Sequence, residues 1–213
     1  LRAHKETNRR SHRPLPPTTI MNKHTEMKSG EMTMAVLACG TMGTAILSGV
    51  LDCQAAMSRG EVSTDLSASS QAGETFERVP LPRKYIATVG RDSTAKRLVR
   101  TFEEAGHTNV EVFKQSNVEA VRKSDLVLLC TKPQRVSEFL SEPGMQEALE
   151  GKMVVSIAAG TTIAKIKQSV PSSTKVVRAM PNTPCRIREG MTVISDVKEL
   201  SHEQRDLLAT IFS

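Results

Sequence analysis

The small-residue loop A-C-G-T-M-G, at positions 38–43, is the first candidate binding site along the chain. A short apolar run precedes this loop and a helical pattern follows it, as in the strand, loop and helix of a dinucleotide-binding site. The N-terminus of such a helix presents unpaired backbone N–H groups to a pyrophosphate. The pattern predicts a dinucleotide site, and the alternative is an ordinary strand-to-helix turn.

The three glycine positions of the G-x-G-x-x-G pattern have different physical requirements. Gly40 would let the backbone approach the phosphates, and Gly43 would let the helix pack closely on the sheet. Ala38 stands where the first glycine is expected, so we expect its φ to stay negative, where a Cβ is tolerated. We interpret Cys39 as a small space-filling residue and not as a reactive thiol.

The residues after the second expected strand indicate which dinucleotide is bound. An acidic residue there would hold the ribose 2′-hydroxyl of NAD, but the sequence reads T-V-G-R-D-S-T, with Arg91 at that position. A guanidinium and the hydroxyls of Ser93 and Thr94 suit a 2′-phosphate instead. NADPH is therefore favoured over NADH. The alternative is that Arg91 is solvated and that Asp92 or Ser93 caps the next helix.

Three later strand ends are expected at the same crevice. The fourth strand ends in Cys130, Thr131, Lys132 and Pro133, which should border the pyrophosphate and ribose. The fifth ends in the small residues Ala158, Ala159 and Gly160, which leave room for a flat ring. The sixth runs into Met180, Pro181, Asn182 and Thr183, a loop that its prolines stiffen at the nicotinamide end. A plain surface lysine at Lys132 and a structural turn after the sixth strand are the alternatives.

Alternating strands and helices must position these residues. The expected strands are 34–38, 85–89, 110–113, 125–131, 153–158, 175–179 and 191–195. The expected helices are 42–53, 93–105, 117–123, one that opens near Pro133, 162–169 capped by Thr161 or Thr162, and 199–212. This alternation predicts a doubly wound, mostly parallel Rossmann-type α/β sheet in the strand order 3-2-1-4-5-6.

Charge divides the chain into a basic tail and a nearly neutral body. The formal net charge is +6, but residues 1–30 hold seven Lys/Arg and two Asp/Glu, which leaves +1 for the rest. Residues 1–31 are predicted to be a disordered basic tail. Residues 32–196 are predicted to form one NADP-binding domain with a surface insertion over 54–83.

Composition argues against several classes of function. No apolar run reaches the roughly 18 residues of a membrane span, and the neutral body offers no nucleic-acid-binding face. The four cysteines lack metal-ligand spacing, so we expect reduced thiols and no metal site. We expect a cytoplasmic location, with a mitochondrial one as the lesser alternative because the tail is Arg-rich and acid-poor.

Four motifs taken together resemble one known family. In chain order, A-C-G-T-M-G-T-A-I, C-T-K-P-Q, S-I-A-A-G and V-R-A-M-P-N-T-P are similar to motifs of the pyrroline-5-carboxylate reductases. The resemblance covers residues 33–213 apart from the insertion. It implies NADPH-dependent reduction of 1-pyrroline-5-carboxylate to L-proline, the last step of proline biosynthesis, by hydride transfer to a cyclic imine.

The resemblance also implies a role for each site residue. The pyrophosphate would be held by Leu37, Ala38, Cys39, Gly40, Thr41, Met42 and Gly43. Arg91 and Ser93 would meet the 2′-phosphate, and Asn117 would contact the adenosine ribose. Cys130 to Pro133 and Ala158 to Gly160 would line the cofactor, and Met180 to Thr183 would lie near the nicotinamide.

The family has a helical domain after the sheet, which forms the dimer and carries the substrate loop. We therefore expect residues 197–213 to begin such a domain, cut short, and a homo-oligomer only in the full-length form. No residue is a convincing general acid, and His107 and His202 are interpreted as bystanders. A β-hydroxyacid-type NADP dehydrogenase and a non-catalytic dinucleotide-binding fragment are the alternative functions.

Overall fold

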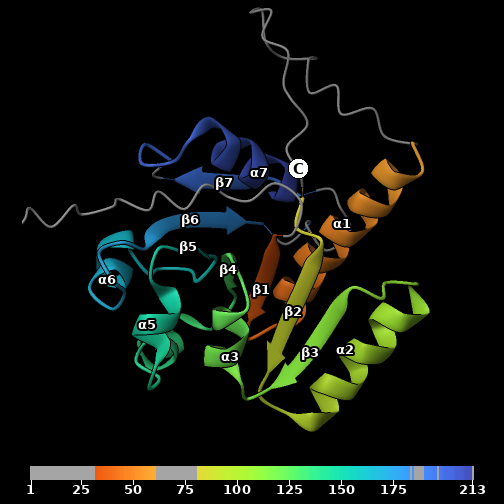
Figure 1. The fold of residues 1–213 in the computed structure, drawn as a ribbon, viewed down its shortest axis with the longest axis horizontal. Helices are drawn as coiled ribbons and strands as arrows, with labels where there is room; N and C mark the ends of the chain where they lie inside the picture. The colour runs from red at the N-terminus through yellow and green to blue at the C-terminus, as the bar shows by residue number, and fades with distance from the viewer. Residues whose placement is uncertain (1–31, 61–80, 183, 185–189, 196, 213) are drawn as a thin grey trace, which may run out of the picture.

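The structure, a computed structural model, describes residues 32–60, 81–182, 184, 190–195 and 197–212. The predicted basic tail and most of the predicted insertion lie outside the described residues. Those residues form a seven-stranded sheet with helices packed on both faces (Figure 1). The predicted doubly wound α/β fold is therefore confirmed.

Each strand of the sheet is short and is followed by helix or turn. The strands are β1 (Thr33–Leu37), β2 (Lys84–Val89), β3 (Val110–Lys114), β4 (Leu126–Leu129), β5 (Met153–Ser156), β6 (Lys175–Pro181) and β7 (Thr192–Ser195). The helices are α1 (Thr41–Ser58), α2 (Asp92–Glu104), α3 (Asn117–Arg122), the 3₁₀ turn η2 (Pro133–Arg135), α4 (Val136–Leu140), α5 (Met145–Leu149), α6 (Ile163–Lys167) and α7 (His202–Phe212).

The strands follow the order β3-β2-β1-β4-β5-β6-β7, which contains the predicted order, with β7 added antiparallel at one edge. In this register Leu37 pairs with Leu129, Leu129 with Ser156, and Ser156 with Arg178. The carboxyl ends of β1, β4 and β5 therefore lie at one level. The connections that follow them meet at the same edge of the sheet, where ligands of this fold class bind.

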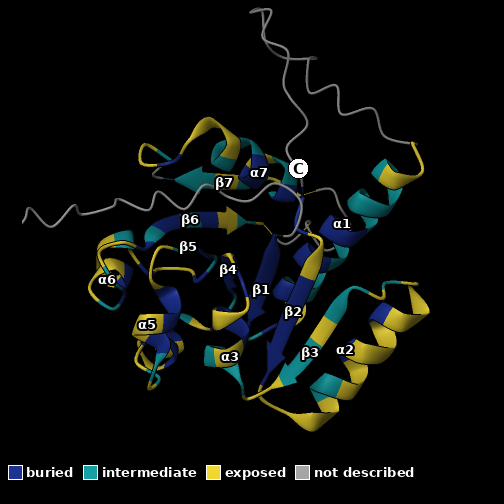
Figure 2. Cartoon of the chain, viewed as in Figure 1, coloured by how far each residue is buried: buried dark blue, intermediate teal, exposed yellow. Residues whose placement is uncertain are grey.

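The central strands are apolar because both of their faces are covered. Met34 and Val36 of β1 join the core cluster of α1, α2 and α7, whereas Ala35 and Leu37 join the cluster of α3 to α6. Buried parallel strands read as continuous apolar runs for this reason. Figure 2 shows the buried β1 and β2 between these helical layers, and the exposed side of α2 facing outward.

Helix α1 extends beyond its predicted end at residue 53, so the insertion begins later than residue 54. The physical reason lies in Gln54, whose side chain donates to the Pro82 carbonyl oxygen at 3.1 Å. Its Oε1 accepts from Asn109 Nδ2 at 3.2 Å and from the Tyr85 hydroxyl at 3.4 Å. These distant partners keep the last turns of α1 ordered up to Ser58.

The last helix belongs to the core of the sheet domain. Leu207, Leu208 and Ile211 of α7 are buried in the same cluster as the apolar side of α1. Residues 197–213 were predicted to begin a following helical domain. In the structure α7 is one of the helices that cover the sheet, and the expectation of a following domain stays a prediction.

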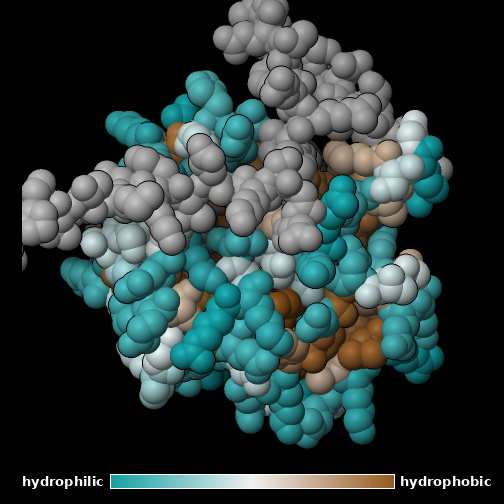
Figure 3. All heavy atoms as spheres, viewed as in Figure 1, coloured by the Kyte–Doolittle hydropathy of each residue, from teal (hydrophilic) through white to brown (hydrophobic). Residues whose placement is uncertain are grey.

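The outer surface is mixed in character. Figure 3 shows mainly hydrophilic side chains on the viewed face, with an apolar area beside β3 and α2. None of the helices in the described part of the chain is both long and apolar enough to cross a membrane.

Candidate dinucleotide-binding site

The loop between β1 and α1 is held in a tight turn by backbone hydrogen bonds. The Cys39 N–H donates to the Thr88 carbonyl oxygen at 2.7 Å, and the Gly40 N–H donates to the Ala38 carbonyl oxygen at 2.7 Å. Gly40 is the N-cap of α1 and provides no side-chain cap. Because the first N–H groups of a helix have no intrahelical acceptor, this end of α1 is suited to an anion.

Ala38 adopts a backbone conformation that we did not expect. Its φ is +53°, in the left-handed region, so the prediction of a negative φ is wrong. The turn must leave the sheet while Ala38 N still donates to Thr88 Oγ1 at 3.1 Å and Cys39 N reaches the Thr88 carbonyl oxygen. A non-glycine residue held in this region costs about 1 kcal/mol or more.

The two glycines of the loop have different surroundings. A Cβ on Gly43 would lie 3.1 Å from Cys130 Sγ and 3.2 Å from Val36 Cγ1, so Gly43 permits the close approach of α1 to β1 and β4. A Cβ on Gly40 would meet only the Ala38 carbonyl oxygen, at 3.8 Å. Packing within the protein therefore explains Gly43 but gives no reason for Gly40.

The thiols beside the loop are unreactive at neutral pH. Burial raises the pKa of Cys39 to about 11, and burial also raises the pKa of Cys130 well above its usual value. Both side chains are therefore protonated at pH 7. This agrees with the interpretation of Cys39 as a space-filling residue.

Arg91 lies at the carboxyl edge, at the N-cap of α2, and its side chain is exposed. Among the described residues no carboxylate forms an ion pair with its guanidinium. The neighbouring Asp92 is paired with Lys114 of β3, at 2.8 Å between Nζ and Oδ1. Ser93 is exposed in the first turn of α2. The capping alternative fails for Asp92 and Ser93, because Arg91 itself occupies the N-cap position.

Asn117 begins α3 beside the end of β2. Its Oδ1 accepts a hydrogen bond of 2.7 Å from the Thr88 hydroxyl, and its Nδ2 donates to Glu142 Oε1 at 2.6 Å. Thr88 is fully buried at the level of the β1–α1 loop. Sequence reasoning named Asn117 but missed Thr88 and Glu142. The signal at Thr88 is a polar residue in the apolar strand Y-I-A-T-V.

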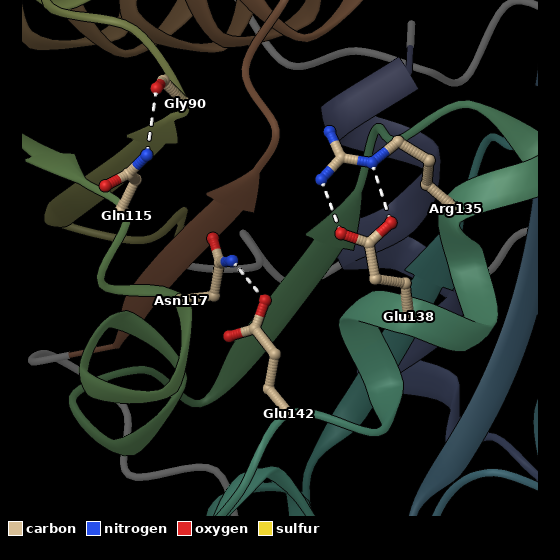
Figure 4. Close-up of polar contacts among 6 residues, drawn as sticks. All are labelled: Gly90, Gln115, Asn117, Arg135, Glu138 and Glu142. Carbon is tan, nitrogen blue, oxygen red and sulfur yellow. Dashed lines mark hydrogen bonds and ion pairs between the residues drawn. The ribbon is translucent and has the colours of Figure 1, made fainter.

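Gln115 joins the ends of β2 and β3. It has a φ of +51°, and its Nε2 donates to the Gly90 carbonyl oxygen at 3.3 Å. Figure 4 shows this contact on one side of Asn117 and the ion pair of Arg135 and Glu138 on the other. The Asn117–Glu142 contact lies between them. These residues lie near the edge of the sheet where the adenosine is predicted to bind.

The end of β4 lies directly beside β1. The Cys130 N–H donates to the Leu37 carbonyl oxygen at 3.0 Å, which brings the predicted Cys130–Pro133 segment next to the loop of residues 38–43. Thr131 is buried, whereas Lys132 is exposed at the N-cap of η2. Arg135 in η2 lies over the Phe139 ring, 5.0 Å from its centroid.

The segments after β5 and β6 follow strands at the other end of the predicted crevice. Ala158 is buried, whereas Ala159 and Gly160 are exposed, and the open space at Gly160 agrees with the predicted lack of bulk. Met180 is 39% exposed near the end of β6. Asn182 closes the β6–β7 hairpin, since its Oδ1 accepts from the Met191 N–H at 2.9 Å. Thr183 lies outside the described residues.

Neither a metal-binding cluster nor His107 lies at this site in the part of the chain that the structure describes. Among them no three His, Cys, Asp or Glu side chains are grouped as a metal would require. His107 was interpreted as a bystander on a surface loop, but its side chain is only 9% exposed and its Nε2 lies 3.1 Å from Asp52 Oδ1. It follows α2 at the amino edge of the sheet, opposite the crevice.

Comparison with curated proteins supports the resemblance seen in the motifs. The chain is 38% identical over 199 residues to a pyrroline-5-carboxylate reductase of Lophium arboricola, which covers 88% of this chain and 60% of that protein. It is 37% identical over 209 residues to a pyrroline-5-carboxylate reductase of Neurospora crassa, with 86% and 59% covered. The chain thus spans about three fifths of the length of these relatives.

A solved structure shares the fold. The pyrroline carboxylate reductase of Plasmodium falciparum, crystallised with NADP bound, has a TM-score of 0.58 and 20% identity, and the match covers 85% of this chain and 54% of that one. At the family level, the model described as "NADP oxidoreductase coenzyme F420-dependent" matches residues 33–160, more than half of the chain. The chain therefore belongs to the NADP oxidoreductase coenzyme F420-dependent family.

Proposed function

We propose that this chain binds NADPH and serves the reduction of 1-pyrroline-5-carboxylate to L-proline. The observation that carries the proposal is the identity of 37–38% to two pyrroline-5-carboxylate reductases along most of the chain. The sheet order and the residues gathered at its carboxyl edge support it independently. Fold alone would not select a reaction, because related sheets host many chemistries.

The β1–α1 loop fits the pyrophosphate of such a cofactor. The space in front of Gly40 is open, and the first turn of α1 has no side-chain cap. Residues Leu37 to Gly43 would therefore supply backbone N–H groups and a helix dipole to the phosphates. The end of β4, Cys130 to Pro133, would border the same group.

The end of β2 fits a 2′-phosphate better than a free hydroxyl. Arg91 is exposed, and Ser93 stands beside it in the first turn of α2. Asp92 could repel a phosphate, but Lys114 balances its charge at 2.8 Å. We therefore assign the 2′-phosphate to Arg91 and Ser93, and the ribose to Asn117.

The chain's own contribution to the reaction is to position the nicotinamide ring of the cofactor. The bound cofactor supplies the hydride that the imine carbon accepts. Ala158 to Gly160 and Met180 to Thr183 would lie beside the nicotinamide and leave room for the ring. We assign no general acid, because His107 lies at the opposite edge of the sheet and is bound to Asp52.

Partners and location follow from the same proposal. We propose pyrroline-5-carboxylate as a small-molecule substrate, no nucleic-acid or membrane partner, and a homo-oligomer in the full-length family form. We place the protein in the cytoplasm, which the free thiols of Cys39, Cys53 and Cys130 support. A fluorescent fusion that colocalised with mitochondria would contradict this location.

A pair of assays tests the function. NADPH binding is measured first by fluorescence titration, and NADPH oxidation is then followed with pyrroline-5-carboxylate. We expect NADPH binding by this chain, and imine-dependent oxidation by the full-length family form, in which the helical domain carries the substrate loop. Reduction of NADP⁺ by a β-hydroxyacid would favour the dehydrogenase alternative, and binding without any turnover would favour a non-catalytic role. Absence of NADPH binding would contradict the proposal outright.

A further inference from the structure

The side chain of Asn117 is held from both ends by groups on other elements. Its Oδ1 accepts from the Thr88 hydroxyl at 2.7 Å, and its Nδ2 donates to Glu142 Oε1 at 2.6 Å. Glu142 lies in the connection between α4 and α5, 25 residues further along the chain. Figure 4 shows its carboxylate directed at the amide of Asn117. No motif in the sequence pointed to this residue.

The hydrogen-bond directions in this chain of groups are fixed. The Thr88 hydroxyl accepts from the Ala38 N–H at 3.1 Å, so its own proton is free to be donated to Asn117 Oδ1. The amide must then turn its NH₂ toward Glu142, and an ionised carboxylate can only accept. Glu142 therefore completes a network in which the amide has one orientation.

This network connects the parts of the crevice that face the adenosine half of a dinucleotide. Ala38 belongs to the β1–α1 loop, and Thr88 precedes Val89, Gly90 and Arg91 at the end of β2. Asn117 is the first residue of α3. One amide hydrogen of Asn117 points to Glu142, and the second keeps a fixed direction and is available to a ligand.

The neighbouring cation, Arg135, is hydrogen-bonded to a different carboxylate. Arg135 hydrogen-bonds Glu138 with Nη2 to Oε1 at 2.8 Å and Nε to Oε2 at 3.0 Å. Its guanidinium is also stacked over Phe139. The Glu142 carboxylate, which is partly buried, is thereby left to Asn117.

We propose that Glu142 is a positioning residue for the adenosine ribose, acting through Asn117. Its carboxylate orients the Asn117 amide so that the second N–H meets a ribose hydroxyl. Glu142 itself needs no contact with the ligand. This inference rests on the proposed function, because it assumes that the crevice takes an adenine dinucleotide.

The test compares substitutions that separate hydrogen bonding from charge and reach. Glu142→Gln keeps the length and an acceptor oxygen but loses the charge, whereas Glu142→Asp keeps the charge but is one methylene shorter. The ligands are NADPH and adenosine 2′,5′-bisphosphate, which carries the adenosine half alone. Affinities are measured by calorimetry and unfolding temperatures by circular dichroism.

We expect Glu142→Asp and Glu142→Ala to weaken both ligands about 5- to 10-fold, the scale of one lost hydrogen bond to an oriented group. Glu142→Gln should stay within about 2-fold of the unsubstituted chain, because its amide oxygen still accepts from Asn117. The double variant Glu142→Ala, Asn117→Ala should bind both ligands no more weakly than Asn117→Ala alone, because Glu142 acts only through Asn117.

Several results would overturn the inference. They are additive losses in the double variant, normal binding by Glu142→Asp together with weak binding by Glu142→Gln, or loss of NADPH affinity with unchanged affinity for the bisphosphate. If Glu142→Ala does not fold, the Gln and Asp variants still decide. Failure of the unsubstituted chain to bind either ligand would instead contradict the proposed function.

Discussion

The two ends of the predicted crevice differ in the side chains that line them. At the proposed adenosine end, Thr88 of β2, Asn117 of α3 and Glu142 of the α4–α5 connection hydrogen-bond one another. At the proposed nicotinamide end, the segments after β5 and β6 carry small residues, and Met180, Met191 and Val193 are exposed by 39%, 71% and 53%. The Asn182 side chain closes the β6–β7 hairpin.

This difference indicates where binding specificity resides. Polar groups fixed by one another are preorganised for a ligand and lose little entropy when it binds. Exposed methionines adapt to their surroundings and specify little. We therefore expect cofactor affinity and the choice of NADPH over NADH to depend on the adenosine end, and substitutions at the other end to change them little.

Replacing Arg91 should have the largest effect on cofactor choice. Arg91→Ala removes a charge-assisted bond to the 2′-phosphate, so NADPH should bind about 10- to 100-fold more weakly. NADH lacks that phosphate and should bind about as before. Unfolding temperature should not change, because the exposed Arg91 side chain makes no capping bond. Parallel titrations with both cofactors measure this, and equal losses would remove the 2′-phosphate role.

Substitution of Gly43 should disturb the close packing of α1 against β1 and the end of β4. A Cβ there would lie 3.1 Å from Cys130 Sγ, and we expect Gly43→Ala to lower the free energy of unfolding by about 2 kcal/mol through overpacking. Gly49 is the matched control in the same helix, because a Cβ there meets nothing within 4 Å. Gly49→Ala should raise stability by up to about 1 kcal/mol. Urea unfolding compares the two, and similar stabilities would contradict the close packing of α1.

A smaller change in stability, in the stabilising direction, is expected from substitution of Ala38. Its φ of +53° strains an alanine but not a glycine, so Ala38→Gly should raise the free energy of unfolding by about 1 kcal/mol or less, after the entropy cost of glycine. Gln115 has a similar φ, but Gln115→Gly would also lose the bond to the Gly90 carbonyl. Thermal unfolding should separate them: Ala38→Gly is the more stable variant. A destabilised Ala38→Gly would mean that the strain is absent.

The smallest effect on stability and on NADPH affinity is expected at the proposed nicotinamide end. Met191→Ser replaces a side chain that is 71% exposed, so stability should change by no more than about 0.5 kcal/mol. NADPH affinity should also stay within about 2-fold. The same thermal and titration measurements check this, and a loss comparable to that of Arg91→Ala would abolish the contrast between the two ends.

The alternation of strands and helices was enough to predict the fold. Continuous apolar runs such as L-V-L-L, bounded by helical patterns, indicate buried parallel strands, and the strand order is the one typical of this fold class. The helix start at residues 40–43 was likewise predictable from its small residues. These features depend on neighbours in the sequence.

The features that prediction missed depend on partners far away in the chain. Gln54 prolongs α1 through contacts with Pro82 and Asn109, which local patterning cannot reveal. Glu142 joins the site only because a connection places it beside Asn117. The positive φ of Ala38 arises from its bond to Thr88, on a different strand. The contrast between the two ends was therefore visible only in three dimensions.

Substitution of Gly40 tests whether the β1–α1 loop binds a dinucleotide phosphate. The folded chain leaves space for a Cβ there, with only the Ala38 carbonyl oxygen at 3.8 Å. The measurement is a calorimetric titration of NADPH into Gly40→Ala and the unsubstituted chain, with matched unfolding temperatures. We predict an unchanged unfolding temperature and an affinity at least about 10-fold lower, because the methyl group occupies the place of the pyrophosphate. Normal NADPH affinity in Gly40→Ala would mean that this loop does not hold the pyrophosphate.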